Sequence, residues 1–346
     1  MTQAALSQAD RNAASRSPEG VGRGVGGFLR ASLVERREAA IVIVAIALFA
    51  YFTAASSNFL TVPDMQNLSQ FIGPVAVIGA GEVFLLVCAE VDLSAGTVFV
   101  FMPFVVYFLD TGLGVPLILA IIVAVAVGAL VGAVNGLITT ALRVPSFIAT
   151  LGMLFLLDGI MLIASNAAQL TMPTSGTLSS VFGGWGWSEI LWSLAVVAVL
   201  YVLLNRTRFG MHAIATGGNL IGAAEAGVPV NRVKIWCFML CSAVSGLIGI
   251  VDATRITVLD PGNTGTTEMF YAISAAVIGG TALTGGSGTV IGGFIGAVVL
   301  GVLFVGLTIV GISANAFILI LGLAILAAMV ANVQIAKLSQ KRRAAT

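Results

Sequence analysis

Apolar residues form runs of about 20 residues along the chain from Ala39 to Val333, and short polar or glycine-containing segments separate these runs. A helix needs about 20 apolar residues to cross the hydrocarbon core of a bilayer. We therefore predict an all-α, polytopic membrane protein with about ten spans. Two spans are short, so eight spans and two re-entrant segments is the alternative. The predicted spans are Ala39–Ala55, Leu68–Ala89, Thr97–Leu109, Val115–Thr139, Ser146–Ser165, Ile190–Leu204, Ile235–Ala253, Phe270–Leu283, Val290–Val310 and Ala314–Val333.

Glycines recur at helical spacing in two places, at positions 128, 132 and 136 and at positions 288, 292 and 296. Small residues four apart let helix backbones approach closely in lipid, so both sets predict helix packing. The short third and eighth spans, one in each half, are flanked by glycine and suggest discontinuous helices beside a substrate path, by analogy with secondary transporters. VDLSAGTV (91–98) also faintly echoes ALTGGSGTV (282–290), which suggests a weak internal repeat.

One long polar stretch, Asn205–Lys234, interrupts the apolar pattern and contains a compact helix signature. Asn219 is a suitable N-cap, since its side-chain oxygen can accept a backbone N–H of the first turn. Leu220–Ala226 then predicts about two helical turns, which Gly227 ends in the left-handed region before Pro229. A helix this short cannot span a bilayer and is marginal in water. We predict that it docks on a partner at the membrane face.

Composition supports the membrane assignment and charge orients the chain. Hydrophobic residues make up 58% of the 346 residues and charged residues only 9%, against roughly a quarter in soluble domains. Fifteen of the sixteen Lys and Arg residues cluster in four regions, which the positive-inside rule places in the cytoplasm. Both termini are then cytoplasmic, and Asn166–Glu189, with Trp185 and Trp187, faces outside. The four regions are Arg11 to Arg37, Arg143, Arg206 to Lys234, and Lys337 to Arg343, and only Arg255 lies elsewhere.

The pattern predicts three parts. Residues 1–38 lack an apolar run and are expected to form a disordered cytoplasmic tail. Residues 39–333 form the transmembrane domain, whose cytoplasmic coupling loop is 205–234. Residues 334–346 form a basic cytoplasmic tail.

Acidic residues within or beside apolar spans are candidates for a transport path. A charge at the bilayer centre is unfavourable by at least about 2.5–3.5 kcal/mol, so such residues usually face a cavity or a partner. Asp158 lies deepest, whereas Glu90, Asp92 and Glu268 equally fit helix-capping roles at the interfaces. Glu82 shares this setting. The candidate pathway residues are Glu90, Asp92, Ser94, Asp158 and Glu268.

No residues suggest an enzyme, a metal site or a cofactor. The chain has no phosphate-binding loop of the G-x-x-x-x-G-K-[ST] type, as expected of a subunit powered by a partner. Cys88, Cys237 and Cys241 lie in apolar segments and predict helix packing. GGSG at 285–288 matches the surroundings of a rhomboid-type serine nucleophile, Ser287. A serine nucleophile needs an adjacent base, but the only histidine, His212, is in the polar loop, so an intramembrane enzyme is disfavoured. An ion-coupled secondary transporter that uses the intramembrane carboxylates is the main alternative.

Four segments together resemble the permease subunits of bacterial ABC importers for monosaccharides, of the ribose/xylose/arabinose type. They are AEVDLSAG (89–96), VPSFIATLGML (144–154), ATGGNLIGAAEAGVPVNRVK (215–234) and YAISAAVIGGTALTGGSGTVIGGFIGA (271–297). The resemblance extends from about Ala39 to Val333. The chain departs from the family pattern at Ala89 and Glu90, where two glycines are usual, and at Ala224 and Asp158, where arginine is common.

The resemblance implies a location in the bacterial inner membrane and a set of partners. These are cytoplasmic ATP-binding subunits, a periplasmic sugar-binding protein and a second permease copy, identical or different. No nucleic acid is expected among them. The resemblance also implies that the predicted docking helix contacts the ATPase, through Gly217, Gly218, Asn219, Ala223, Ala224, Glu225 and Gly227.

Overall fold

The computed structural model describes residues 37–174, 176–313, 316–327 and 330. The predicted tails fall outside these residues, except that Arg37 and Glu38 begin the first helix. The described chain is almost entirely helical, and its one sheet has two strands, β1 (Leu170–Thr171) and β2 (Val258–Leu259), paired antiparallel. The all-α class is therefore confirmed.

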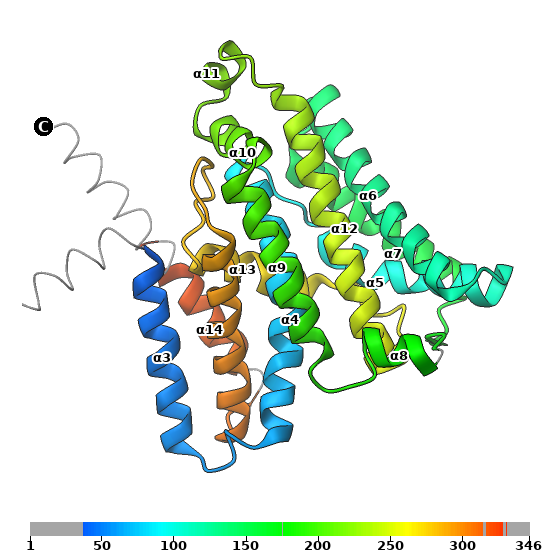
Figure 1. The fold of residues 1–346 in the computed structure, drawn as a ribbon, viewed down its shortest axis with the longest axis vertical. Helices are drawn as coiled ribbons and strands as arrows, with labels where there is room; N and C mark the ends of the chain where they lie inside the picture. The colour runs from blue at the N-terminus through cyan, green and yellow to red at the C-terminus, as the bar shows by residue number, and fades with distance from the viewer. Residues whose placement is uncertain (1–36, 175, 314–315, 328–329, 331–346) are drawn as a thin grey trace, which may run out of the picture.

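Each of the ten predicted spans corresponds to a helix (Figure 1). Seven described helices are long and apolar enough to cross a membrane, and three shorter apolar helices accompany them, at Ala39–Ala55, Thr266–Ile278 and Ala316–Ala327. The labelled spans are α3 (Arg37–Ala55), α4 (Val62–Val87), α5 (Ala95–Tyr107), α6 (Leu117–Ala141), α7 (Ser146–Ala164), α9 (Ser188–Arg206), α12 (Val230–Ile256), α13 (Thr266–Ile278) and α14 (Val290–Ile309). The π-helical turn η1 (Phe108–Gly112) extends α5, so that the two together reach 18 residues.

The spans divide into two sets of five, α3 to α7 and α9, α12, α13, α14 and 316–327. In each set the second helix is long, with 26 or 27 residues, and the third has 13. The two sets therefore match in the lengths of their second and third helices. The weak internal repeat suggested between 91–98 and 282–290 stays a prediction, and the two segments lie at different places in these sets. Segment 91–98 joins the second and third helices of its set, whereas 282–290 joins the third and fourth.

The two short helices meet at their N-terminal ends. A Cβ added to Gly96, in the first turn of α5, would lie 2.0 Å from the backbone oxygen of Gly265, just before α13. Thr97 Oγ1 also donates a hydrogen bond to the backbone oxygen of Thr264 (2.9 Å). Helix α13, with 13 residues, is about 20 Å long and too short for a hydrocarbon core of about 30 Å, whereas α5 together with η1 reaches the length of a candidate span. The two helices begin against each other.

The core of the molecule surrounds α4, whose residues are buried without interruption from Gly73 to Val87. A helix that is buried on every side can carry apolar residues on every side, and in this stretch of α4 only Glu82 is charged. Glycine allows the close approach of α6 to α12, since a Cβ on Gly132 would lie 2.3 Å from the backbone oxygen of Phe238. Gly296 of α14 approaches Ala275 of α13 in the same way. The packing role predicted for both glycine sets is confirmed.

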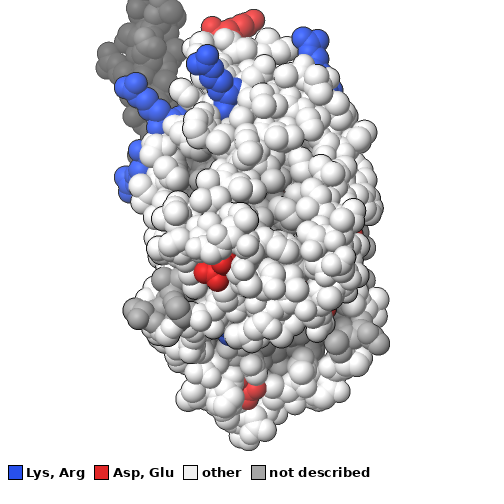
Figure 2. All heavy atoms as spheres, turned by 90° about the vertical axis from the view of Figure 1, so that its right-hand side faces the viewer, with Lys and Arg blue, Asp and Glu red and all other residues white. Residues whose placement is uncertain are grey.

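The two ends of the bundle differ in charge. Helices α10 (Arg208–Gly218) and α11 (Leu220–Glu225) lie at one end, and α8 (Gly176–Phe182) lies at the other (Figure 1). Figure 2 shows Lys and Arg side chains gathered toward the α10–α11 end, above a broad surface with few charges. The positive-inside rule assigns that end to the cytoplasm. Arg255, the exception in the sequence, lies near the C-terminal end of α12 and pairs with Glu189 and Asp252.

Candidate functional site: the basic end and two buried polar regions

Helix α11 has the caps that the sequence predicts. Asn219 Oδ1 accepts a hydrogen bond from the N–H of Gly222 (2.9 Å), and Gly227 has a φ of 83°. The N–H of Gly227 donates to the oxygen of Ala224, and the N–H of Val228 donates to the oxygen of Ala223, both at 3.0 Å. This is the Schellman arrangement, which satisfies the last carbonyls of a helix. The predicted helix is confirmed and ends one residue earlier than expected, at Glu225.

Helix α11 presents apolar side chains at a polar end of the molecule. Ile221 is 71% exposed and Leu220 is 48% exposed, whereas Ala223 is buried. A short helix with exposed apolar residues is suited to binding a partner. Of the predicted coupling residues, Asn219 and Gly227 thus form the caps and Ala223 packs inward, while Ala224 and Glu225 are exposed.

Helix α10, which the sequence analysis missed, connects α11 to the core. A Cβ on Gly217 would lie 1.9 Å from the backbone oxygen of Val87, at the end of α4. The N–H of Gly286 donates to that same oxygen (2.8 Å), and Gly218 lies beside Gly286. A Cβ on Gly285 would also lie 2.9 Å from the Cβ of Ala89, so three of the segments that carry the resemblance meet at this end. Thr207 is the N-cap of α10, and its Oγ1 accepts a hydrogen bond from the N–H of Gly210.

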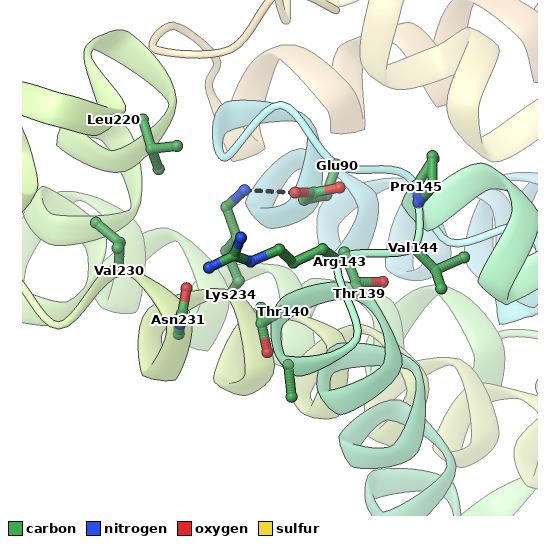
Figure 3. Close-up of a pocket in the computed structure, with 11 residues that line it drawn as sticks. Glu90, Thr139, Thr140, Arg143, Val144, Pro145, Leu220, Val230, Asn231 and Lys234 are labelled. Atoms are coloured by element: carbon green, nitrogen blue, oxygen red, sulfur yellow. Dashed lines mark hydrogen bonds and ion pairs between the residues drawn. The ribbon is translucent and has the colours of Figure 1, made fainter.

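A cavity of about 580 Å³ lies beside α11 (Figure 3). Lys234 Nζ and Glu90 Oε1 form an ion pair across it, 2.5 Å apart. Figure 3 shows the guanidinium of Arg143 reaching toward Lys234 and Asn231, and no ion pair of Arg143 is present among the described residues. Arg143 has a φ of 58°, which is rare for a residue other than glycine. Glu90, predicted for the transport path, is therefore at the same end as the docking helix.

A second polar region lies deep in the bundle, around the connection between α4 and α5. Asp92 Oδ1 accepts hydrogen bonds from the N–H and Oγ of Ser94, at 2.9 and 2.5 Å. Asp92 Oδ2 accepts from Ser242 Oγ of α12 (3.2 Å), and Asn135 Nδ2 of α6 donates to Ser94 Oγ (2.8 Å). Glu82 Oε2 accepts weakly from the N–H of Asp92. All five side chains are fully buried. We call Glu82, Asp92, Ser94, Asn135 and Ser242 the buried junction.

The remaining two candidate pathway residues, Asp158 and Glu268, lie apart from both the cavity beside α11 and the buried junction. Asp158 is half-buried on α7, whose neighbouring Phe155 is 65% exposed, and it has no hydrogen bond or ion pair within the described chain. Glu268 lies in the first turn of α13 and lines a cavity of about 350 Å³ between α4, α5, α12, α13 and α14. The structure therefore brings Asp92 and Ser94 together but separates Glu90, Asp158 and Glu268.

Comparisons with known proteins agree with the motifs. A family model described as "Branched-chain amino acid transport system / permease component" matches residues 64–329. The xylose/arabinose import permease protein XylH of Sulfolobus acidocaldarius is 34% identical over 311 residues, covering 87% of this chain and 85% of that protein. The ribose import permease protein RbsC of Escherichia coli K12 is 31% identical, with coverage of 83% and 89%. The L-arabinose ABC transporter permease protein AraH of Azospirillum brasilense is 33% identical, with coverage of 75% and 77%. No solved structure matches significantly.

Proposed function

Because this chain belongs to the family described as the permease component of branched-chain amino acid transport systems, we propose that it forms the membrane path for a monosaccharide in an ATP-driven importer. It is a multi-pass inner-membrane permease subunit of an ABC importer, a transport component and not an enzyme. The relatives at 31–34% identity bear the names of xylose/arabinose, ribose and L-arabinose import permeases. These names support a pentose or a similar sugar as the substrate.

The partner proposal has three components. An ABC permease works with ATP-hydrolysing and substrate-binding partners, so this chain has partners of both kinds. More specifically, we propose cytoplasmic ATP-binding subunits that dock on α11, a periplasmic sugar-binding protein that docks at the opposite end, and a second permease copy beside this one. The observation that carries the docking proposal is α11 itself, a helix capped at both ends that exposes Leu220 and Ile221 at the basic end.

The ion-coupled alternative is not favoured. It was based on intramembrane carboxylates, and the relatives are ABC import permeases. Two of those carboxylates also have local explanations, because Asp92 holds the start of α5 and Glu90 pairs with Lys234. A carboxylate that already has donors or a cation beside it has less need of a transported ion.

Reconstitution tests the proposal. The purified chain in liposomes should hydrolyse no ATP and accumulate no sugar, because it lacks a phosphate-binding loop. Addition of the ATPase subunits and the binding protein should restore ATP-dependent uptake of D-xylose, D-ribose or L-arabinose. Uptake by the chain alone under an imposed proton or sodium gradient would support the ion-coupled alternative instead.

A further inference from the structure

The cavity that Glu268 lines has a wall of packed aromatic rings. The Phe71 ring of α4 stacks on Phe304 of α14, with ring centroids 4.8 Å apart, and lies 5.4 Å from Tyr271 of α13. Phe317 supports all three from the last span, at 5.0 to 6.4 Å. We call Phe71, Tyr271 and Phe304 the aromatic wall. Ring-to-ring contacts between helices of both sets of five hold this wall in place.

Polar groups face the same cavity. Gln70, Asp252, Arg255, Thr267 and Glu268 line it together with the aromatic wall. An adjoining cavity of about 360 Å³ shares Gln70, Phe71, Arg255 and Phe304 with it and also includes Asp64 and Asn67. Ligand sites typically have volumes of about 300–1,000 Å³ and combine apolar walls with a few polar groups. We call this combined region the outer cavity, since it lies away from the α10–α11 end.

The polar groups have unused capacity for hydrogen bonds. Glu268 Oε2 is buried and has no partner in the described chain, which is unfavourable for a carboxylate oxygen. The side-chain amide of Gln70 likewise has no hydrogen bond among the described residues. A sugar hydroxyl can donate to a carboxylate and both donate to and accept from an amide. An aromatic face is electron-rich, so it attracts the C–H groups on the apolar face of a sugar ring.

The charges of the outer cavity discriminate between classes of substrate. Its one cation, Arg255, is already engaged, because Nη2 contacts Asp252 Oδ1 (2.8 Å) and Nε contacts Glu189 Oε1. Three carboxylates, those of Asp64, Asp252 and Glu268, line the outer cavity together with this single guanidinium. An amino acid or a sugar phosphate would bring an anionic group that finds no free cation. An uncharged polyhydroxylated solute avoids that repulsion.

We propose that the outer cavity is the subsite where an uncharged monosaccharide enters the transport path. The sugar ring lies on the aromatic wall, and its hydroxyls contact Gln70, Asp252 and Glu268. This assignment rests on the proposed function and extends it, because it places the sugar in this chain and predicts that amino acids and sugar phosphates are rejected.

Transport by the complete importer in proteoliposomes tests the subsite. Glu268→Gln removes a charged acceptor with little change of shape, and Phe71→Leu removes the stacking face. Each should lower ATP-driven uptake of D-xylose, D-ribose or L-arabinose about tenfold or more, as expected when a charge-assisted hydrogen bond or an aromatic contact is lost. Binding-protein-stimulated ATP hydrolysis should stay within about twofold, which also shows that the variants fold and assemble. Matched controls are Asp110→Asn in η1 and Phe155→Leu, 65% exposed on α7.

A second measurement reports occupancy directly and does not depend on uptake. Thr267→Cys places an exposed thiol at the cavity, and the three native cysteines are buried, so an impermeant thiol reagent should label position 267. A high concentration of the transported sugar should slow labelling at least about threefold, whereas L-leucine and ribose 5-phosphate should not.

The outcomes distinguish a failure of the subsite proposal from a failure of the proposed function. If the unmodified importer takes up sugar but neither cavity variant lowers uptake and no sugar protects position 267, the subsite is wrong and the proposed function stands. If L-leucine protects as well as the sugar does, the charge argument is wrong. If the unmodified complete importer moves none of the three sugars, the proposed function itself fails.

Discussion

At the scale of single residues, two glycines near α11 are required for different physical reasons. Gly227 has open space around it, with no atom within 4 Å of an added Cβ, but its φ of 83° disfavours any side chain. Gly217 has ordinary helical geometry, but an added Cβ would lie 1.9 Å from the backbone oxygen of Val87. Gly227 is needed for its backbone conformation and Gly217 for close contact with α4. Different substitutions are therefore needed to test the two roles.

Gly227→Val should impair coupling without preventing membrane insertion. A β-branched residue in the left-handed region is unfavourable by roughly 1–2 kcal/mol, so the capped end of α11 should fray or change direction. Sugar uptake and ATPase co-purification should fall while the abundance of the chain in the membrane stays normal. Gly227→Asn, which tolerates the same dihedrals, is the control and should retain uptake. Normal uptake by the valine variant would show that α11 is a passive connector.

Gly217→Ala should instead lower stability. One methyl group forced against the end of α4 should destabilise the fold by about 1–3 kcal/mol, the usual range for overpacking. Gly218→Ala is the matched control, because the nearest atom to its added Cβ is 3.7 Å away. Thermal denaturation of both variants in detergent should show a lower Tm for Gly217→Ala only. Equal Tm values would mean that α10 does not pack on α4 as described.

At the scale of elements, the buried junction fixes the connection between α4 and α5. Asp92 accepts hydrogen bonds from its own connection and from α12, and its neighbour Ser94 accepts one from α6. The junction therefore ties the connection between α4 and α5 to two longer helices, α6 and α12. The side chains of Asp92, Ser94, Asn135 and Ser242 are buried and joined by hydrogen bonds, and such bonds make buried polar groups tolerable.

Asp92→Leu should destabilise the protein strongly. It leaves the hydroxyls of Ser94 and Ser242 with fewer acceptors in a fully buried site, and unsatisfied buried groups cost about 1–3 kcal/mol each. Asp110→Leu in η1, where the aspartate is only half-buried, is the control. The expected result is a markedly lower Tm in detergent for Asp92→Leu alone. An unchanged Tm would mean that Asp92 serves transport and is not needed for folding.

The elements also show what the sequence could and could not predict. Apolar run length located every span, and cap residues located α11, because both signals are local. Helices α8 and α10 were missed because they are short and have no apolar run. The aromatic wall was missed because Phe71, Tyr271 and Phe304 lie on three helices far apart in the chain, and no local pattern joins them. For the same reason Glu90 and Glu268 looked alike in sequence but lie at opposite ends.

At the scale of the whole molecule, the two ends of the bundle differ in chemistry. The basic end has α10, α11 and the pair of Lys234 with Glu90, while the opposite end has the outer cavity with its excess of carboxylates. Arg255, the single basic residue at the outer end in the described part of the chain, is paired with two acidic residues. The orientation that we predict for the chain rests on this asymmetry.

Cysteine labelling in intact cells tests that orientation. Ile221→Cys on α11 should be shielded from an impermeant thiol reagent, and Gln169→Cys, exposed beside β1, should be labelled. The native cysteines are buried and give little background. Membrane permeabilisation should then expose position 221. Labelling at 221 but not at 169 in intact cells would reverse the topology.

The contact between Gly96 and Gly265 has a consequence for how this sequence can vary. Each glycine blocks the space that a side chain on the other would need, since a Cβ on either would lie within 2.0 Å of the backbone oxygen of its partner. Both positions already hold the smallest residue, so no change at one can make room for a change at the other. At other close contacts between the halves, such as Gly132 against Phe238, only one of the two residues must be glycine, whereas here both must be. Two positions far apart in the gene therefore behave as one site under a single constraint.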